Sequence, residues 1–210
     1  MTLVRINANP CTVEDFHGFR ITRNYIFSIF KPSVFNENCD TLMSFFRSTR
    51  TLTLEAADEI SNKIIDCCRK NQFNPLTITI VDASSNIILQ KRMDGCPSGA
   101  FDKFSQAKAT AAASLMIPSR NFSKKYAVDD HSKMLQGISM VGLTNNTIAP
   151  FPGGIVLRDI ETNDVLGAVG CSGAAGDEDE YCALIGVQKS SFASKIVTDP
   201  VNHSCTTYKE

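Results

Sequence analysis

The spacing of hydrophobic residues predicts regular structure from Thr53 onward. From Leu54 the apolar side chains recur every three or four positions, which is typical of an amphipathic helix that ends near Asn71. Thr53 stands where an N-cap hydroxyl is expected. Apolar and polar residues then alternate over 76–82 and a second extended run covers 87–93, so these segments predict a β-hairpin.

Alanine dominates the next predicted element, a helix over 100–117 that Pro118 ends. Its small side chains give it a narrow profile, which can pack closely on a sheet or on a copy of itself. A short helix is predicted over 119–126. The pattern over 129–142 is mixed and indicates one further helical turn.

Two strands are predicted over 155–157 and 165–170, joined by the polar turn 158–164. Only small residues occupy the glycine-rich bend 170–176, so the backbone there approaches something closely, either another part of the protein or a ligand. A last helix is predicted over 177–187.

The order of these elements predicts an α/β fold of the α+β sandwich type. Too few long crossovers are present for a parallel sheet, so we expect an antiparallel sheet with helices packed on it. The domain is predicted over 51–190, followed by a polar C-terminal tail over 191–210. Residues 1–50 form an N-terminal extension with three open interpretations: an organellar targeting peptide, an upstream extension before a start at Met43, or an appendage packed through its aromatic residues.

Composition narrows the class of protein. Hydrophobic residues make up 43% and charged residues 20% of the 210 residues, as in a soluble globular protein. The net charge of −1 gives no global field that would attract nucleic acid, and no apolar run is long enough to span a bilayer. Eight cysteines without a signal peptide or a C-x-x-C pair predict reduced thiols in a cytoplasmic or mitochondrial or other organellar compartment rather than a secreted protein.

Five separate segments, in an unbroken order from Thr51 to Gln188, resemble the haem-binding protein HbpS and GlcG family, which includes the C-terminal domain of PduO-type corrinoid adenosyltransferases. The segments are LTLEAADEI at 52–60, ITIVDASSNIILQKRMDG at 78–95, KATAAA at 108–113, PFPGGIVL at 150–157 and GAVGCSGAAGDEDEYCA at 167–183. The resemblance implies a five-stranded antiparallel sheet with helices on both faces, somewhat like profilin. It also implies a homo-oligomer, built from dimers or octameric.

The resemblance suggests function as well. Some family members bind haem, one is an accessory to glycolate utilisation, and many have no established reaction. The family's haem-ligating histidine near the first helix has no counterpart, because Leu52 to Asn71 contains none. His131 is the only histidine within the matched domain and is therefore the candidate ligand for a haem iron. Further weak ligands are offered by Met93, Met116, Met134 and Met140.

A second candidate site lies around three charged residues in apolar or small surroundings, Arg92, Asp94 and Lys108. They can form an internal ion pair, or they can line a pocket for a carboxylate or a haem propionate. The neighbouring candidates for ligand contact are Pro152, Gly153, Gly154, Cys171, Ser172 and Gly173. Cys171 is interpreted as a structural thiol, with a nucleophile or redox thiol as the alternative.

The glycine-rich bend also invites a phosphate-binding interpretation, since it follows a strand and opens a helix. Residues 177–180 are all acidic, however, and their charge at the helix N-terminus repels a phosphate. Close packing is the favoured interpretation.

The sequence therefore predicts an HbpS- and GlcG-like small-ligand binding or accessory protein that acts as a homo-oligomer. Haem is the candidate cofactor, and binding is favoured over catalysis. One alternative is an enzyme acting on a small carboxylate or cofactor near Asp94, Lys108 and Cys171. The other is a purely structural oligomer.

Overall fold

The computed structural model describes residues 12–14, 20–22, 49–97, 99–126 and 129–199. The chain divides into two units, Met1–Thr49 and Arg50–Glu210. In the first unit, β1 (Thr12–Glu14) and β2 (Arg20–Thr22) pair antiparallel. The second unit holds the elements predicted from the sequence.

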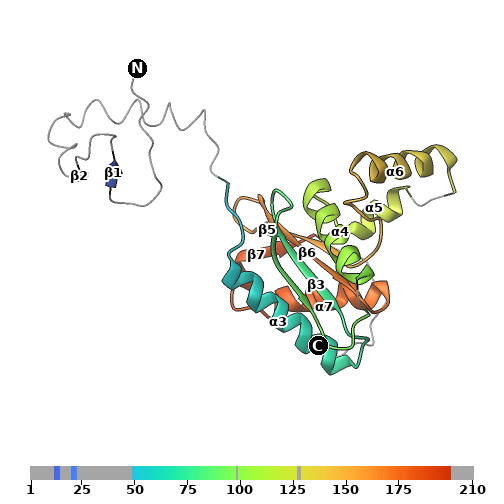
Figure 1. The fold of residues 1–210 in the computed structure, drawn as a ribbon, viewed down its shortest axis with the longest axis horizontal. Coiled ribbons are helices and arrows are strands. Elements are labelled where there is room, and N and C mark those ends of the chain that lie inside the picture. The colour runs from blue at the N-terminus through green and yellow to red at the C-terminus, as the bar shows by residue number, and fades with distance from the viewer. Residues whose placement is uncertain (1–11, 15–19, 23–48, 98, 127–128, 200–210) are drawn as a thin grey trace, which may run out of the picture. The chain divides into compact units, whose positions relative to one another are not determined.

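The second unit is built on one five-stranded sheet in the order β4-β3-β6-β5-β7 (Figure 1). Every neighbouring pair is antiparallel, which confirms the predicted sheet type. The strands are β3 (Thr77–Asp82), β4 (Ile87–Arg92), β5 (Gly154–Asp159), β6 (Val165–Ser172) and β7 (Ile196–Thr198).

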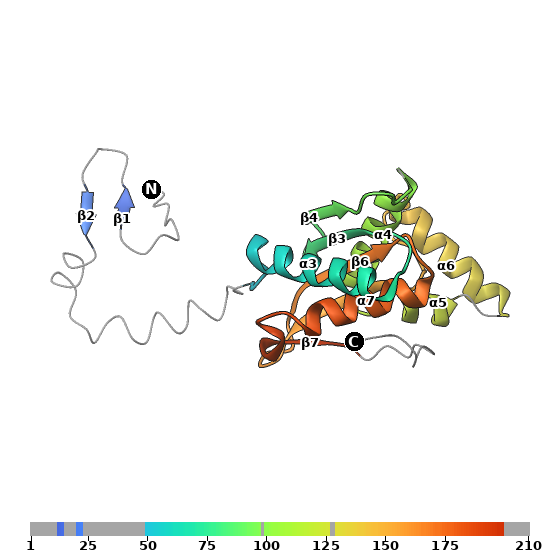
Figure 2. The ribbon, with the colours of Figure 1, turned by 90° about the horizontal axis from the view of Figure 1, so that it is seen from below.

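Helices cover both faces of the sheet, as predicted. Helices α3 (Leu54–Asn71) and α7 (Gly176–Gln188) pack together on one face, and α4 (Ala100–Leu115) lies on the other (Figures 1 and 2). Beyond α4 lie α5 (Ser119–Tyr126) and α6 (His131–Leu143). No described helix combines the length and the apolar character that a membrane span requires.

The two faces of the sheet have different chemistry, because side chains alternate along each strand. Ile78 and Ile80 join Ile155, Leu157 and Val169 in the main apolar cluster with α3 and α7. The opposite face of β3 presents hydroxyls to α4, where Thr79 hydrogen-bonds Ser105 at 2.7 Å between oxygens. The alanines of α4 complete this thin layer, packing on Val81 and Ala168.

Several boundaries and three elements, α6, η2 and β7, differ from the sequence prediction. The predicted turn of 129–142 is the 13-residue helix α6, capped by Asp130, whose carboxylate accepts from Ser132 N and Lys133 N. Strand β6 runs on to Ser172, so Cys171 and Ser172 belong to the sheet. The predicted polar tail was wrong for its first part, since a 3-10 helix, η2 (Ala193–Lys195), leads into β7 at the sheet edge.

Candidate functional site

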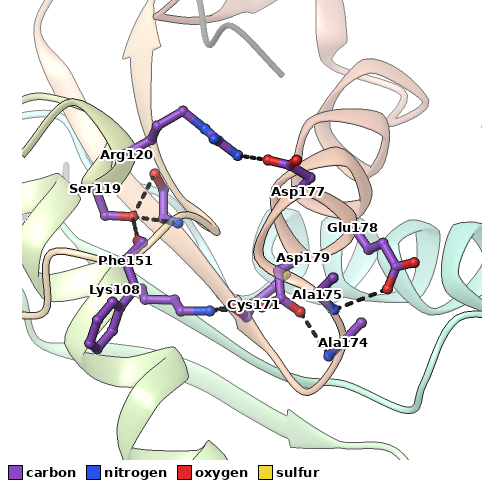
Figure 3. A network of polar contacts seen from close by, with 11 residues as sticks. Lys108, Ser119, Arg120, Phe151, Cys171, Ala174, Ala175, Asp177, Glu178 and Asp179 are labelled. Carbon is purple, nitrogen blue, oxygen red and sulfur yellow. Dashed lines mark hydrogen bonds and ion pairs between the residues drawn. The ribbon is translucent and has the colours of Figure 1, made fainter. Parts of the chain in front are cut away.

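A buried ion pair links α4, β6 and α7. The Lys108 ammonium donates to the Asp179 carboxylate at 2.7 Å and to the Cys171 carbonyl oxygen at 2.8 Å (Figure 3). Lys108 is 4% exposed and Asp179 only 1%. The lysine is the residue that the sequence singled out as a charge in an alanine-rich helix, and its acid stands at the start of the last helix.

Two opposing effects act on the pKa of the Asp179 carboxyl. Burial raises its pKa to about 6, although the Lys108 ammonium acts in the opposite direction. Its second oxygen accepts from Ala174 N at 3.1 Å, in the bend just before α7. Asp179 therefore ties the bend to α4.

A second ion cluster lies beside the first. Arg120 on α5 donates from Nη2 to Asp177 (Figure 3). It also donates from Nε to Glu180 Oε1 at 2.7 Å. Glu178 accepts from Ala175 N at 3.0 Å, which caps α7. Each of the four acids at the start of α7 thus contacts a group of the protein itself.

The small residues of the glycine-rich bend pack against the chain itself. A Cβ placed on Gly170 would lie 2.1 Å from Ser105 O and 2.6 Å from Ala109 N, both in the backbone of α4. A Cβ on Gly173 would lie 2.3 Å from Pro75 O. The close approach that the sequence left open is therefore made by α4 and by the segment before β3.

The predicted site residues divide into two groups in space. Gly153, Gly154 and Cys171 lie beside Lys108: Lys108 donates to Cys171 O, and a Cβ on Gly153 or Gly154 would lie 3.1 Å from Lys108 Nζ or 2.3 Å from Lys108 O. Pro152 lies against Gly176, where an added Cβ would be 3.2 Å from Pro152 Cβ. Arg92 is exposed and lies 4.0 Å from Asp102, measured between Nη1 and Oδ2. Asp94 is also exposed.

Lys108 does have an internal ion pair, but the acid is Asp179 rather than Asp94. Sequence reasoning also missed Arg120 and Ser119. The Ser119 hydroxyl accepts from Gly154 N at 2.8 Å and donates to Phe151 O. The one sequence feature that pointed to these ion pairs was the run of four acids at 177–180. The sequence analysis interpreted it only as negative charge at the N-terminus of the last helix.

The Cys171 thiol is fully buried, and burial together with the nearby Asp179 carboxylate raises its pKa well above the ordinary value. A thiol in this setting stays protonated, which suits a structural role. Within the described part of the chain, no three His, Cys, Asp or Glu side chains gather to hold a metal ion.

An apolar hollow of about 140 Å³ opens between α5 and α6. Its lining residues are Tyr126, Met134, Gly137, Ile138 and Pro150. Gly137 allows the helices to approach, since a Cβ there would lie 2.8 Å from the Cβ of Tyr126. Beside the hollow α6 exposes large apolar side chains to an unusual degree, with Leu135 and Ile138 each 66% exposed.

The candidate haem ligands lie in different places relative to this hollow. His131 is the exposed first residue of α6, one helical turn before Met134, which lines the hollow. Met93 accepts from Leu76 N at 3.4 Å, and Met140 packs in the small apolar cluster around Phe122. Met116 is exposed at the end of α4.

A family model described as haem degrading protein HbpS-like matches residues 52–188. Comparison with curated protein sequences gave no match. Klebsiella pneumoniae protein ORFY is 23% identical, with 67% of this chain and 91% of that chain covered and a TM-score of 0.59. A double mutant of HbpS from Streptomyces reticuli is 22% identical, with 67% of this chain and 88% of that chain covered and a TM-score of 0.56. The PduOC:haem complex is 17% identical, with 65% of this chain and 92% of that chain covered and a TM-score of 0.55. At these identities the three structures confirm the fold.

Proposed function

We propose that this chain, which belongs to the HbpS-like family, binds a small ligand with a broad apolar face, and that this ligand is haem. The family match over 52–188 confirms the resemblance seen in the sequence between Thr51 and Gln188. The family's description names haem degradation, and one solved relative of the same fold is a haem complex. The observation that carries the proposal is the apolar hollow beside α6.

The hollow suits one edge of a porphyrin ring. At about 140 Å³ it is smaller than the roughly 300–1,000 Å³ of pockets that enclose whole ligands. A ring would therefore lie across it, with its remaining apolar surface against the exposed Leu135 and Ile138. Removing these side chains from water is favourable by about 25 cal/mol per Å².

Residues of α6 would hold the haem iron. Met134 lines the hollow and His131 lies one turn before it on the helix, so a thioether or an imidazole would be the ligand that the protein supplies. This assignment replaces the family's histidine near the first helix, which this chain lacks.

Hemin titration followed by absorbance tests the proposal. We expect a shifted Soret band in the native protein, and its loss or displacement in His131→Ala or Met134→Leu. Met116→Leu is the matched control, because Met116 is an exposed methionine outside the hollow. A spectrum of native protein that equals that of free hemin contradicts the proposal, as does equal binding by all three variants.

We also propose that the protein acts as a homo-oligomer. Leu135, Ile138 and Leu143 are all exposed on α6, and Leu143, which does not line the hollow, is 85% exposed. Large exposed apolar side chains gathered on one element mark interaction sites.

Replacing the two outer leucines tests the oligomer. Leu135→Ser/Leu143→Ser is expected to lower the molar mass measured by light scattering at least twofold at equal concentration. Leu54→Ser, on the exposed first turn of α3, is expected to leave the mass unchanged. A native protein that is monomeric at every concentration rules the proposal out.

A further inference from the structure

A lysine ammonium lies beside the apolar hollow between α5 and α6. Lys125, the second-last residue of α5, holds its Nζ 5.2 Å from the centroid of the Tyr126 ring. Tyr126 lines the hollow together with Ile138. The side chain of Lys125 is exposed, and its four-carbon stem is flexible. A positive charge is therefore available at the rim of the apolar surface on which the proposed ligand lies.

The Tyr126 side chain has packing partners on both α5 and α6. It meets the fully buried Phe122 edge to face, with 5.3 Å between the ring centroids. Helix α6 approaches it at Gly137, where an added Cβ would lie 2.8 Å from Tyr126 Cβ and 3.4 Å from its Cγ. An ammonium is attracted to an aromatic ring through the cation–π interaction. Because the ring is held by its neighbours, this attraction favours a position of the Lys125 Nζ beside the hollow.

Lys125 forms no ion pair with an acid in the part of the chain that the structure describes, unlike two other cations of α5 and α6. Arg120 donates to two acids of α7, and Lys133 lies 3.8 Å from Asp130. Lys108, which the sequence analysis offered to a haem propionate, is 4% exposed and paired with a buried carboxylate. The charge of Lys125 is thus available to an anionic group of a ligand.

We propose that Lys125 gives the hollow its ligand specificity, by forming an ion pair with a carboxylate at the edge of a flat apolar ring. This inference rests on the proposed function and defines the chemistry of its ligand. The ring would lie on the hollow and leave water, whereas the carboxylate and the ammonium would stay at the surface, so that neither charge is buried without a partner. The contact involves no iron, so a metal-free porphyrin tests it separately from any axial ligand.

Fluorescence titration of the full chain with metal-free deuteroporphyrin IX, a porphyrin dicarboxylate, tests the role of Lys125. Lys125→Glu is expected to raise the Kd about tenfold, because an exposed attraction is replaced by a repulsion of similar size. Lys70→Glu is the matched control, since Lys70 is an exposed lysine in the last turn of α3 and its replacement changes the net charge equally. We expect its Kd to stay within about twofold of the native value, since Lys70 does not line the hollow.

The dimethyl ester of the same porphyrin, titrated in the same co-solvent, tests the carboxylate without any variant. We expect the native protein to bind the ester more weakly than the dicarboxylate, and Lys125→Glu to bind the ester as the native protein does. Equal Kd values for ester and dicarboxylate, or for the two glutamate variants with the dicarboxylate, overturn the inference.

Hemin distinguishes this failure from a failure of the proposed function. A native protein that shifts the Soret band of hemin but binds the metal-free porphyrin without regard to its carboxylates, or fails to bind it, refutes the role of Lys125 alone. A native protein that binds neither hemin nor the porphyrin refutes the proposed function together with this inference.

Discussion

Gly170→Ala is expected to be among the most destabilising small substitutions in the domain, lowering the free energy of unfolding by about 3 kcal/mol or more. A Cβ at Gly170 would overlap Ser105 O and Ala109 N, at 2.1 and 2.6 Å. Both atoms belong to the backbone of α4, so no side-chain rotation can relieve the contact. Either α4 or β6 must shift, and each is anchored by Lys108 and its partners. Urea unfolding followed by circular dichroism measures the loss.

Two other glycines serve as controls for this result. Gly142 lies in exposed α6 with no atom within 4 Å of an added Cβ, so Gly142→Ala is expected to leave stability unchanged or raise it by up to about 1 kcal/mol. Gly186→Ala meets a side-chain atom, Ile64 Cγ1, at 2.3 Å, so its additional loss is expected to be smaller in an Ile64→Ala background, where Cγ1 is absent. A Gly170→Ala protein as stable as the native one would mean that α4 does not lie this close to β6.

The elements that the sequence predicted well are those whose pattern reports a single local environment. Helix α3 buries one stripe, and Thr53 caps it by accepting from Ala56 N, so both its start and its period were readable. Strand β3 alternates because Ile78 faces the apolar cluster while Thr79 meets Ser105. The alanines of α4 indicated close packing, and Gly170 is the residue that receives it.

The elements that were missed depend on partners distant in sequence. Strand β7 is three residues long and becomes a strand only by pairing with β5, some forty residues earlier in the chain. Helix α6 shows no clear buried stripe, because Gly137 is its one buried residue and its large apolar side chains face outward. The exposure that hid the helix from pattern analysis is the property on which the proposed ligand site rests.

Only part of the candidate site could be predicted from the sequence, because its residues also depend on partners that are distant in sequence. A lysine on an alanine-rich helix indicates a buried partner, but the sequence does not reveal which acid lies 71 positions away. Asp94 was near in sequence, whereas Asp179 is near in space because β6 brings α7 under α4. The placement of Arg92, Asp94, Lys108, Pro152–Gly154 and Cys171–Gly173 around a bound ligand remains a prediction.

Lys108→Met is expected to lower the free energy of unfolding by about 3–5 kcal/mol near pH 8, because it leaves the Asp179 carboxylate buried without its cation. The loss should be smaller near about pH 5, where protonation can neutralise the carboxyl. Because the folded pKa of Asp179, about 6, lies above the ordinary 3.8, its contribution to stability is fully present below pH 3.8. That contribution is lost as the pH rises through about 6. Without Lys108 the pKa of Asp179 rises further. As the pH is raised, Lys108→Met is therefore expected to go on losing stability above the pH at which the native protein stops losing it.

The double variant Lys108→Met/Asp179→Leu distinguishes two contributions to the free energy of unfolding: that of the intact ion pair, and the loss caused by leaving one buried charge without its partner. Both charges are then gone from a site only 4% and 1% exposed, so stability is expected to return to within about 2 kcal/mol of the native protein. The decline in stability between about pH 4 and 6 should flatten, since the group that produces it is absent.

Lys133→Met is the matched control, because its partner Asp130 lies 3.8 Å away at the surface. We expect its effect on the free energy of unfolding to be small and not to change measurably with pH. A Lys108→Met deficit that is equal at both pH values would show that Asp179 is not the carboxyl this lysine neutralises. A double variant no more stable than Lys108→Met would show that the ion pair is needed for packing that apolar side chains cannot replace.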